Sequence, residues 1–586
     1  MADQTAGQGI TSRSDAARTA DRVPARAWRT LVRHKAVLGL TAVLLGAFAH
    51  YCYWNEGSTA NVMFVLSVAA LVLTTLMLVT RRILVSTIIV TALAGIIVAA
   101  STVKVELMHM AVHAYDVVYY LSSPATLTFL VAKYPLVMAQ LFGALGALAA
   151  ITYLSHRIDE TRVPRLYSAV GIVCLALLTA AAAKSKDARA AWRLFEDGLA
   201  LTKFLGSWPE TIDTIWRGQL VEAAAGPSGA PLSVPQSCHP EKKPPHVILI
   251  HQESVVPPEY FPALEYDKAM DPMFRSGDGA LHMLRVETYA GASWLTEFSI
   301  LAGVSTYSFG SMRPFVQALM AGKVHDTLPE AFTRCGYRNV VFYPLDKNFV
   351  GNGRFYEAVG MGEIIDRKAQ GASTSWERDA FHYDNLLKLI GAHVRTSSQP
   401  LFSFLLTIAT HQPYDTPFKP ELDVRGGGPG TEPGMNEFLR RLSMARIDLE
   451  AFEKELARRF PSEQFLIVHY GDHQPTTTWH YVSADDQAAI RSGARELAQA
   501  SPAFITYYAA KGINYTPPAL PKLEALDVPY LGLVVLEAAG LPLSESYQER
   551  KRLMQLCGGR YATCAKRDEI LAFHRRLIDS GLLVAR

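Results

Sequence analysis

Five apolar stretches in the first third of the chain constrain its fold most strongly. They occupy residues 36–53, 61–80, 83–101, 126–154 and 166–183. Most are near the ~20 residues that a helix needs to cross ~30 Å of hydrocarbon. One such run also occurs in buried cores, but five in succession predict a transmembrane domain over residues 35–184. The fourth run contains Lys133 and Pro135, which leaves its true span open.

The charges that flank these stretches predict their orientation. Residues 1–34 are polar and rich in Arg, without an apolar signal core and cleavage site, so we expect an uncleaved, disordered cytoplasmic tail. Nearly neutral loops alternate with basic ones, whose side chains include Arg81, Arg82, Arg157, Arg162 and Arg165. Because Lys and Arg gather on the cytoplasmic side, everything after about residue 184 is expected outside the cytoplasm.

Residues 185–245 separate the apolar stretches from the rest of the chain. Their first part predicts amphipathic helices at the membrane surface, with apolar side chains at helical spacing. These side chains are Trp192, Phe195, Leu199, Phe204, Trp208, Ile212 and Trp216. Packing against the following domain is an alternative, and both can hold at once. From about residue 224 the segment is rich in Pro, Gly and Ser, which is typical of a linker.

Residues 246–586 have the pattern of an α/β domain. Short apolar runs, typical of parallel strands buried on both faces, alternate with helical patterns. The runs are 247–250, 340–343, 402–408, 465–468 and 503–508. The clearest amphipathic helix covers residues 442–460. We therefore predict a mostly parallel sheet sandwiched by helices.

Cysteine spacing and net charge add two smaller constraints. The six cysteines include no Cys-x-x-Cys zinc spacing. Cys557 and Cys564 are predicted to form a disulfide if they lie outside the cytoplasm, and two thiols are the alternative. A pairing of Cys238 with Cys335 stays open. The formal net charge of +3 over 586 residues gives no argument for a nucleic-acid partner.

Three of the predicted strands lead into side chains suited to metal or proton chemistry. Glu253, His411 and the pair Asp472-His473 follow the runs at 247–250, 402–408 and 465–468. Ligands bind beyond the carboxyl ends of strands in open α/β sheets, so these residues are expected at one edge. Asp472-His473 alone fits a capped turn as well as a metal site. With Glu253 it predicts a site for a divalent cation with one position left open.

The run Gly291-Ala292-Ser293-Trp294 contains a candidate nucleophile. Residues 294–301 can form a helix, which places Ser293 at its N-cap. A simple cap is the plainest interpretation. A hydroxyl at a helix N-terminus beside a divalent cation is also activated, because the cation lowers its pKa and the helix end favours an anionic substrate.

Four motifs appear in a fixed order along the chain. They are Gln252-Glu253-Ser254, Ser293-Trp294-x-x-Glu297-Phe298, His411-x-Pro413-Tyr414 and Gly471-Asp472-His473. This order resembles the lipoteichoic acid synthase-like family of membrane phosphoglycerol transferases, in the alkaline phosphatase and sulfatase superfamily. Five spans followed by an external catalytic domain are also similar to that family, so the resemblance covers nearly the whole chain. It implies an alkaline phosphatase/sulfatase-like fold over residues 246–586.

The resemblance implies roles for the candidate residues. Four side chains would coordinate one divalent metal, usually Mn²⁺, with Zn²⁺ and Mg²⁺ as alternatives. These are Glu253, Ser293, Asp472 and His473. His411 would bind phosphate or protonate the leaving group, and Trp294 would contact the substrate. Arg354 would contact the phosphoryl or glycerol group, with Arg313 as a weaker rival.

Two features depart from the family pattern. The usual nucleophile is Thr, whereas Ser293 stands here; both are hydroxyls, and Thr288 and Thr296 remain as other candidates. Of the three, Ser293 has the right distance from the Glu-Phe pair that follows. The Trp and His that the family has beside the phosphoglycerol-binding Arg are not evident near Arg354. The residues there are Leu345, Asp346 and Gly353.

These features together predict a transfer reaction at the membrane surface. A phosphoglycerol head group would pass from phosphatidylglycerol, through a covalent adduct on Ser293, to a periplasmic glycan or glycolipid. One alternative is a phosphoethanolamine transferase that takes its head group from phosphatidylethanolamine and acts on lipid A or a glycan. Others are a phosphodiesterase or sulfatase-like hydrolase and a non-enzymatic membrane sensor. We expect the chain in the bacterial cytoplasmic (inner) membrane, with its catalytic domain in the periplasm.

Overall fold

The computed structural model describes residues 22–108, 110–122, 124–185, 198–218, 220–226, 228–374, 376–492 and 499–585. The chain forms two compact units, Met1–Pro209 and Glu210–Arg586. The basic tail up to residue 21 lies outside the described residues. So do Trp192 and Phe195 of the predicted amphipathic segment.

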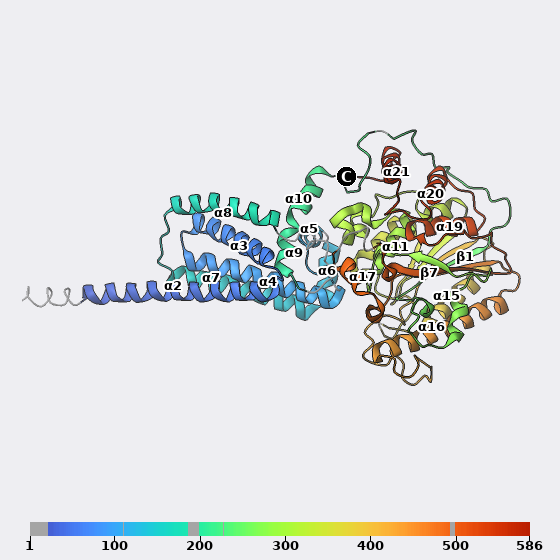
Figure 1. Cartoon of the computed structure of the whole chain (residues 1–586), viewed down its shortest axis with the longest axis horizontal. Helices are drawn as coiled ribbons and strands as arrows, with labels where there is room; N and C mark the ends of the chain where they lie inside the picture. The colour runs from blue at the N-terminus through green and yellow to red at the C-terminus, as the bar shows by residue number, and fades with distance from the viewer. Residues whose placement is uncertain are drawn as a thin grey trace, which may run out of the picture. The chain divides into compact units, whose positions relative to one another are not determined.

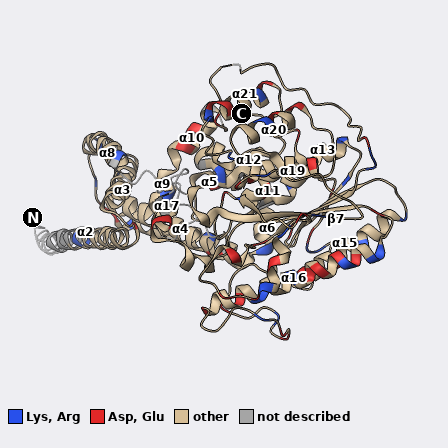
Figure 2. Ribbon diagram, turned by 45° about the vertical axis from the view of Figure 1, so that its right-hand side comes forward, with Lys and Arg blue, Asp and Glu red and all other residues tan. Residues whose placement is uncertain are grey.

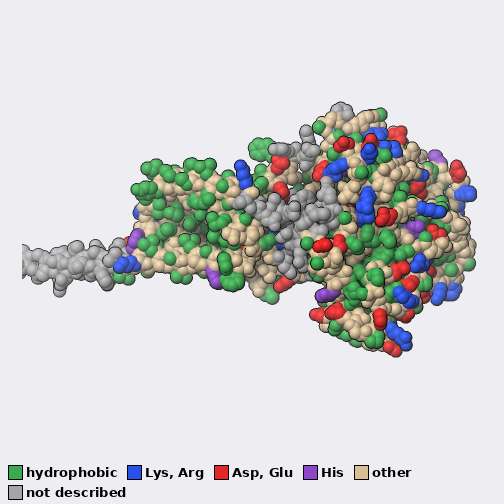
Figure 3. Space-filling model, in the orientation of Figure 1, with side chains coloured by type: hydrophobic (Ala, Val, Ile, Leu, Met, Phe, Trp, Pro, Cys, Tyr) green, Lys and Arg blue, Asp and Glu red, His purple; other side chains and the backbone are tan. Residues whose placement is uncertain are grey.

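Long apolar helices make up most of the N-terminal unit (Figure 1). Among the described residues, five are long and apolar enough to cross a membrane, as predicted. They are α2 (Arg22–Asn55), α3 (Thr59–Thr80), α4 (Ile83–Met108), α7 (Pro135–Ile158) and α8 (Arg165–Ser185). Hydrophobic side chains dominate the visible face of this unit, where charged side chains are few (Figure 3). The pattern is that of a membrane domain.

Two boundaries in this unit differ from the prediction. α2 begins at Arg22, so the end of the predicted tail is helical rather than disordered. The fourth apolar run is two helices, α6 (Pro124–Lys133) and α7, and only α7 is long enough to span. Pro135 has no backbone N–H and stands in the first turn of α7, where that N–H would have no partner anyway. One helix therefore ends at Lys133 and the next begins after it.

Buried polar contacts fix the short elements of the N-terminal unit. Lys104 Nζ lies 2.6 Å from Asp116 Oδ2, which ties α4 to α5 (Ala114–Ser122). The buried Glu56 carboxylate accepts hydrogen bonds from two backbone N–H groups at the start of α9 (Ala200–Gly206). These N–H groups have no partner within the helix, so Glu56 satisfies them and holds α9 against α3 and α4.

The described part of the predicted amphipathic segment is helical. It contains α9 and α10 (Trp208–Arg217). α10 exposes Ile212 and Trp216, of which Trp216 is 87% exposed. Exposed apolar side chains on a short helix are typical of a surface that meets lipid or another protein.

One sheet organises the C-terminal unit. In its described residues the sheet has eight strands in the order β4-β3-β5-β1-β6-β7-β2-β8. The strands are β1 (His246–Gln252), β2 (His282–Arg285), β3 (Arg338–Phe342), β4 (Glu363–Ile365), β5 (Leu401–Leu406), β6 (Phe465–Gly471), β7 (Ile505–Ile513) and β8 (Leu526–Asp527). From β4 to β6 all neighbours are parallel, so their carboxyl ends meet at one edge of the sheet.

All five predicted strands are present, and the mostly parallel sheet is confirmed. The run at 503–508 lies at the start of β7, which is antiparallel to β6. Apolar content shows that a strand is buried but does not encode its direction. β2, β4 and β8 were not predicted. They have four, three and two residues, which are too few to show a pattern.

Helices cover both faces of this sheet (Figure 1). α15 (Asp379–Val394) and α16 (Pro433–Arg459) pack together on one face, and α11 (Ser293–Ala302) and α19 (Leu531–Ala538) lie on the other. α16 buries apolar side chains in the core, and charged residues recur along α15 and α16 (Figure 2). This amphipathic pattern predicted the helix at 442–460, which in the structure begins earlier, at Pro433. The other helices of the unit are α12 (Val316–Met320), α13 (Leu328–Arg334), α14 (Asn352–Ala358), α17 (Ala484–Ser492), α20 (Glu545–Leu556) and α21 (Arg567–Asp579).

The Pro-rich segment at 224–245 is bound along the C-terminal unit. Its backbone N–H groups at Ala224, Leu232 and Cys238 donate to the Leu571 carbonyl, the Ser580 hydroxyl and the Arg334 carbonyl, at 2.6 to 3.0 Å. Pro and Gly prevent a regular helix here, but an extended backbone can still hydrogen-bond to neighbouring elements. A segment with the composition of a linker is therefore an ordered part of this unit.

Two disulfides reinforce the C-terminal unit. Cys557 bonds to Cys564, as predicted, and Cys238 of the Pro-rich segment bonds to Cys335 at the end of α13. The remaining cysteines, Cys52 and Cys174, are unpaired and lie in helices of the N-terminal unit. Disulfides are rare in the reducing cytoplasm, so this distribution favours an oxidising compartment for the C-terminal unit.

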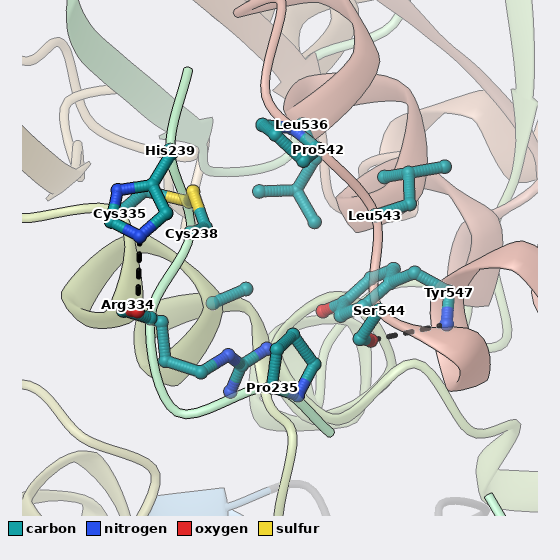
Figure 4. A pocket seen from close by; sticks show the side chains of 12 residues that line it. Pro235, Cys238, His239, Arg334, Cys335, Leu536, Pro542, Leu543, Ser544 and Tyr547 are labelled. Atoms are coloured by element: carbon teal, nitrogen blue, oxygen red, sulfur yellow. Dashed lines mark hydrogen bonds between the residues drawn. A yellow bond between two sulfur atoms is a disulfide. The ribbon is translucent and has the colours of Figure 1, made fainter. Parts of the chain in front are cut away.

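A cavity of about 180 Å³ lies beside the Cys238–Cys335 disulfide (Figure 4). Pro235, Leu543 and Tyr547 form part of its wall, and the Tyr547 hydroxyl points into it. None of the residues that line it was predicted as a site residue. The predicted chemistry must therefore be sought at the carboxyl edge of the sheet.

Removing a disulfide should lower the free energy of unfolding more when the disulfide closes a longer loop. The sequence separations are 97 and 7 residues, and the entropy of the unfolded chain makes the longer loop worth about 2 kcal/mol more. We expect Cys238→Ala/Cys335→Ala to lower the free energy of unfolding by roughly this much more than the matched pair Cys557→Ala/Cys564→Ala. Urea unfolding of the solubilised protein measures both, and equal losses would contradict the prediction.

Candidate active site

The two predicted carboxylates lie at the ends of adjacent strands. β1 and β6 pair in parallel with Gln252 opposite Gly471, so Glu253 and Asp472 leave the sheet side by side. The backbone N–H of Ser254 donates to Asp472 Oδ1 at 2.7 Å, which joins the two turns. Only Gly fits at position 471, because a Cβ there would lie 1.8 Å from the Val255 carbonyl oxygen. At the Gly-Asp-His motif two segments of the chain thus pass close to each other, and the motif ends in side chains that can bind a metal.

Ser293 is the first residue of α11, and its hydroxyl faces the carboxylates. The N-cap position belongs to Ala292, so the prediction of Ser293 as the N-cap is wrong by one residue. Ser293 Oγ donates to Glu253 Oε2 at 2.9 Å and lies 3.4 Å from His473 Nε2. Because the hydroxyl is not used for capping, it is free to take part in chemistry at the sheet edge.

The loop before Ser293 has a strained backbone. Ala290 and Ala292 have φ of 60° and 62°, in the left-handed region that costs a residue with a Cβ about 1–3 kcal/mol. A hydrogen bond from Ala290 N–H to the Gln474 carbonyl, at 3.1 Å, ties this loop to the turn that carries His473. Strain that the surrounding structure holds in place is typical of positioned functional groups.

Donor atoms of Glu253, Asp472 and Ser293 lie around the His473 imidazole. His473 Nε2 lies 3.3 Å from Glu253 Oε1, 3.3 Å from Asp472 Oδ2 and 3.4 Å from Ser293 Oγ. Donors about 2.1 Å from a shared cation lie roughly 3.0 to 3.4 Å from one another. Two carboxylates, an imidazole and a hydroxyl at these spacings fit one divalent cation.

The charges at this edge are balanced by histidines in the absence of a cation. Burial alone would lower the pKa of His473, but Asp472 and Glu253 outweigh it and raise the pKa to about 9. Burial would raise the pKa of Glu253, but the His473 hydrogen bond and the charges of His411, His473 and His251 lower it. Two buried carboxylates thus draw protons onto their imidazole neighbours. A cation in the same place would displace those protons.

His251 belongs to the site although it was not predicted. It lies on β1, and its Nε2 is 3.2 Å from Asp472 Oδ2 while Nδ1 is 2.8 Å from the Tyr470 hydroxyl. Together with Glu253 and Asp472 it forms a group whose ligand atoms all lie within 4.8 Å of one another. The sequence feature that could have identified His251 is its spacing from Glu253. Positions 251 and 253 are two residues apart, so their side chains project to the same side of an extended chain.

His411 is delivered to this edge by the loop after β5. The charge of His411 lowers the pKa of Glu253 through space, without a hydrogen bond between the two side chains. Arg441 of α16 donates to the carbonyls of His411, Pro413 and Thr416, at 2.6 to 3.0 Å, and so fixes the backbone of the loop. The structure thus brings His411 near the Glu253 carboxylate, as the strand-end rule predicted.

The structure gives the other predicted residues different surroundings. Arg354 is exposed on α14, and among the described residues it has no hydrogen bond or ion pair. Trp294 donates from Nε1 to the Pro314 carbonyl at 2.9 Å. Arg313 donates to the Glu287 carbonyl and lies over the Tyr307 ring, which is a structural environment.

The two threonines offered as other nucleophiles use their hydroxyls elsewhere. Thr288 Oγ1 donates to the Gly291 carbonyl at 2.6 Å, and Thr296 Oγ1 donates to the Asp472 carbonyl at 2.9 Å. Both bonds shape the backbone around the site. Of the three candidate nucleophiles, Ser293 is the one whose hydroxyl bonds to a predicted metal-ligating carboxylate.

Comparison with known proteins identifies the class of the C-terminal domain. Residues 245–500 match the family model of the sulfatases. This match confirms the predicted sulfatase-like fold of the C-terminal domain. An uncharacterized protein of Haemophilus influenzae is 23% identical over 355 residues. The match covers 58% of this chain and 60% of the length of that relative.

Several solved structures are similar to this chain at low identity. Phosphoglycerol transferase GacH of Streptococcus pyogenes, in complex with sn-glycerol-1-phosphate, is 18% identical, with a TM-score of 0.46 over 59% of this chain and 87% of that one. Lipoteichoic acid synthase LtaP of Listeria monocytogenes is 14% identical, with a TM-score of 0.37 over 55% and 69%. Phosphoethanolamine transferase EptA of Neisseria meningitidis is 10% identical, with a TM-score of 0.35 over 72% and 84%.

Removing divalent metal should make stability fall as the pH rises. The folded pKa of His473 is about 9 against an ordinary 6.5, so its proton stabilises the metal-free fold fully below about pH 6.5. This contribution, on the order of 3 kcal/mol, is lost as the pH rises through 9. Thermal melts of EDTA-treated protein from pH 6 to 9.5 should show the loss, and Mn²⁺ should reverse it at pH 9. His473→Gln is the control, and an equal slope in that variant would contradict the assignment.

Proposed function

We propose that the protein is a metal-dependent transferase that moves a phosphoglycerol head group from phosphatidylglycerol to a periplasmic glycan or glycolipid. The observation that carries this proposal is the hydrogen bond from the Ser293 hydroxyl to Glu253, within 3.4 Å of His473 Nε2. A nucleophile placed among two carboxylates and an imidazole suits attack on a phosphodiester. The sulfatase-family domain and the motif order support the same reaction class.

Four side chains would hold the cation, for which Mn²⁺ is our first choice and Zn²⁺ or Mg²⁺ the alternatives. They are Glu253, Ser293, Asp472 and His473. When bound, a divalent cation supplies a lowered pKa for the Ser293 hydroxyl and positive charge beside the phosphoryl oxygens. His251 orients Asp472 from behind through its bond to Oδ2.

The chain's own residues then perform two displacements at phosphorus. In the first, Ser293 Oγ loses its proton to solvent and forms a bond to phosphorus, while the bond to the diacylglycerol oxygen breaks. His411 gives that oxygen a proton. In the second, an acceptor hydroxyl gives its proton to His411 and bonds to phosphorus, the bond to Ser293 breaks, and Ser293 Oγ takes a proton back from solvent. Arg354, an exposed residue of α14, is proposed to meet the head group only once the substrate is bound. Trp294 lies beside the nucleophile.

The location of the protein follows from where this donor is found. We infer that residues 35–184 anchor the chain in the cytoplasmic (inner) membrane, with the N-terminus in the cytoplasm and residues 246–586 in the periplasm. The two disulfides of the C-terminal unit and the unpaired Cys52 and Cys174 of the N-terminal unit support this orientation. A lipid donor stays in the bilayer, so an anchored enzyme meets it without extracting it.

The proposed nucleophile can be tested by trapping the covalent intermediate. The solubilised protein is incubated with Mn²⁺ and head-group-labelled phosphatidylglycerol or phosphatidylethanolamine, and Ser293 is examined by mass spectrometry. We expect a phosphoglycerol adduct on Ser293, none in Ser293→Ala, and a retained but slower adduct in Ser293→Thr. Ser237→Ala changes an exposed serine of the Pro-rich segment, so it is the control and should label normally. A phosphoethanolamine adduct would favour the alternative transferase, and head-group release by Ser293→Ala would contradict the mechanism.

His411 can be tested separately through the leaving group. If it protonates the diacylglycerol oxygen, His411→Gln should slow head-group release from a lipid by about 10²-fold or more. A p-nitrophenyl phosphodiester has a leaving group that needs no proton, so the same variant should release p-nitrophenol in the first turnover nearly as fast as the wild type. Equal losses on both substrates would contradict the role as a general acid.

A further inference from the structure

We propose that Trp376 forms the subsite for the acceptor and binds a sugar ring of the acceptor glycan. This inference rests on the transferase activity proposed above. Trp376 is half-buried, and its ring meets the His411 ring edge-on, with centroids 5.1 Å apart and an interplanar angle of 72°. It is an aromatic side chain in contact with the candidate proton donor.

The loop that carries Trp376 is tied to the loop that carries His411. Asp379, three residues after Trp376, accepts hydrogen bonds at Oδ1 from the backbone N–H groups of Ile408 and Ala409, at 3.3 and 3.1 Å. These two residues precede His411 in the same turn. The contact between the two rings is therefore backed by a direct link between their backbones.

The loop that carries Trp376 and the loop that carries His411 are both also bound to α16. Arg378 pairs with Asp448 at 2.6 and 2.8 Å, and the N–H of Ala380 donates to the same carboxylate. Arg441, seven residues earlier on α16, holds the carbonyl of His411 at 2.6 Å. Burying these charged groups is costly unless they are paired, so the pairing indicates that the relative position of the loops is specified. Trp376 is held in place rather than packed by chance.

The chemistry places the acceptor next to His411. In the first displacement the diacylglycerol oxygen receives a proton from His411, and in the second the acceptor hydroxyl gives one back. Both groups must bring an oxygen within hydrogen-bond reach of the same imidazole. A ring that touches the imidazole edge therefore contacts whatever carries that oxygen. The phosphoryl group that is transferred lies between Ser293 on one side and the diacylglycerol or acceptor oxygen on the other.

The class of group that suits Trp376 follows from its shape. An indole has a wide apolar face with a negative quadrupole, and the axial C–H bonds of a pyranose present a matching apolar, slightly positive face. A half-buried indole thus favours a sugar ring over a small flexible alcohol that has no such face. We assign Trp376 as the residue that selects a pyranoside acceptor.

The test separates the two half-reactions in the full-length solubilised protein. Labelling of Ser293 by the lipid donor is timed without an acceptor. Octyl β-glucoside, octyl β-galactoside and glycerol then compete as acceptors, and the products are measured by mass spectrometry. For each variant the amount of product is divided by the amount of labelled Ser293, so a change in the donor step does not enter the comparison of Trp376→Ala with the wild type. In Trp376→Ala the ratio of pyranoside to glycerol products should fall about tenfold, the loss of roughly one stacking contact.

Matched variants make the outcome specific. Trp376→Phe keeps an aromatic face and should retain most of the pyranoside preference, whereas Trp376→Leu keeps apolar volume alone and should lose it even if Trp376→Ala does not fold. Trp479→Ala removes another half-buried indole, which packs against Tyr289 with ring centroids 5.6 Å apart, and should leave the ratio unchanged.

Three results would overturn the inference. They are an unchanged product ratio in Trp376→Ala and Trp376→Leu, an equal loss of Ser293 labelling and transfer, and a wild type that transfers to glycerol but to no pyranoside. Failure of the proposed function has a different signature, because the wild type would then show no labelling of Ser293 by either lipid.

Discussion

The repulsion between two buried carboxylates governs the structure of the site. Glu253 is 8% exposed and Asp472 is fully buried, and the parallel pairing of β1 with β6 brings them to adjacent strand ends. Like charges in such a position are costly unless a cation or protonated neighbours offset them. His473 and His251 supply that offset in the metal-free protein, and a divalent cation can replace their protons. The position of Ser293, hydrogen-bonded to Glu253, follows from the same arrangement.

The sequence was sufficient for the parts of the site that strands deliver. Continuous apolar runs identified β1, β5 and β6, and the rule for parallel sheets placed Glu253, His411 and Asp472 at one edge. The helix after Ser293 was also predicted, within one residue of its start. These successes share a physical basis. Buried parallel strands have a clear apolar pattern, and their carboxyl ends all lie at the same edge of the sheet.

Other parts depend on contacts that no local pattern encodes. Trp376 reaches His411 only because Asp379 and Arg378 fold its loop against β5 and α16, across more than thirty residues of chain. The Pro-rich segment at 224–245 has the composition of a linker, yet distant elements supply its hydrogen bonds. The antiparallel direction of β7 and the short strands β2, β4 and β8 depend likewise on tertiary pairing. Local propensity cannot anticipate these features.

The most direct measurement is anomalous diffraction from crystals of the protein grown with Mn²⁺. Shared coordination by Glu253, Ser293, Asp472 and His473 requires one strong peak at the manganese edge, about 2.0 to 2.4 Å from an oxygen or nitrogen of each side chain. A peak elsewhere, or one that Ser293 does not reach, would contradict the central claim that these residues form one metal-activated nucleophilic site.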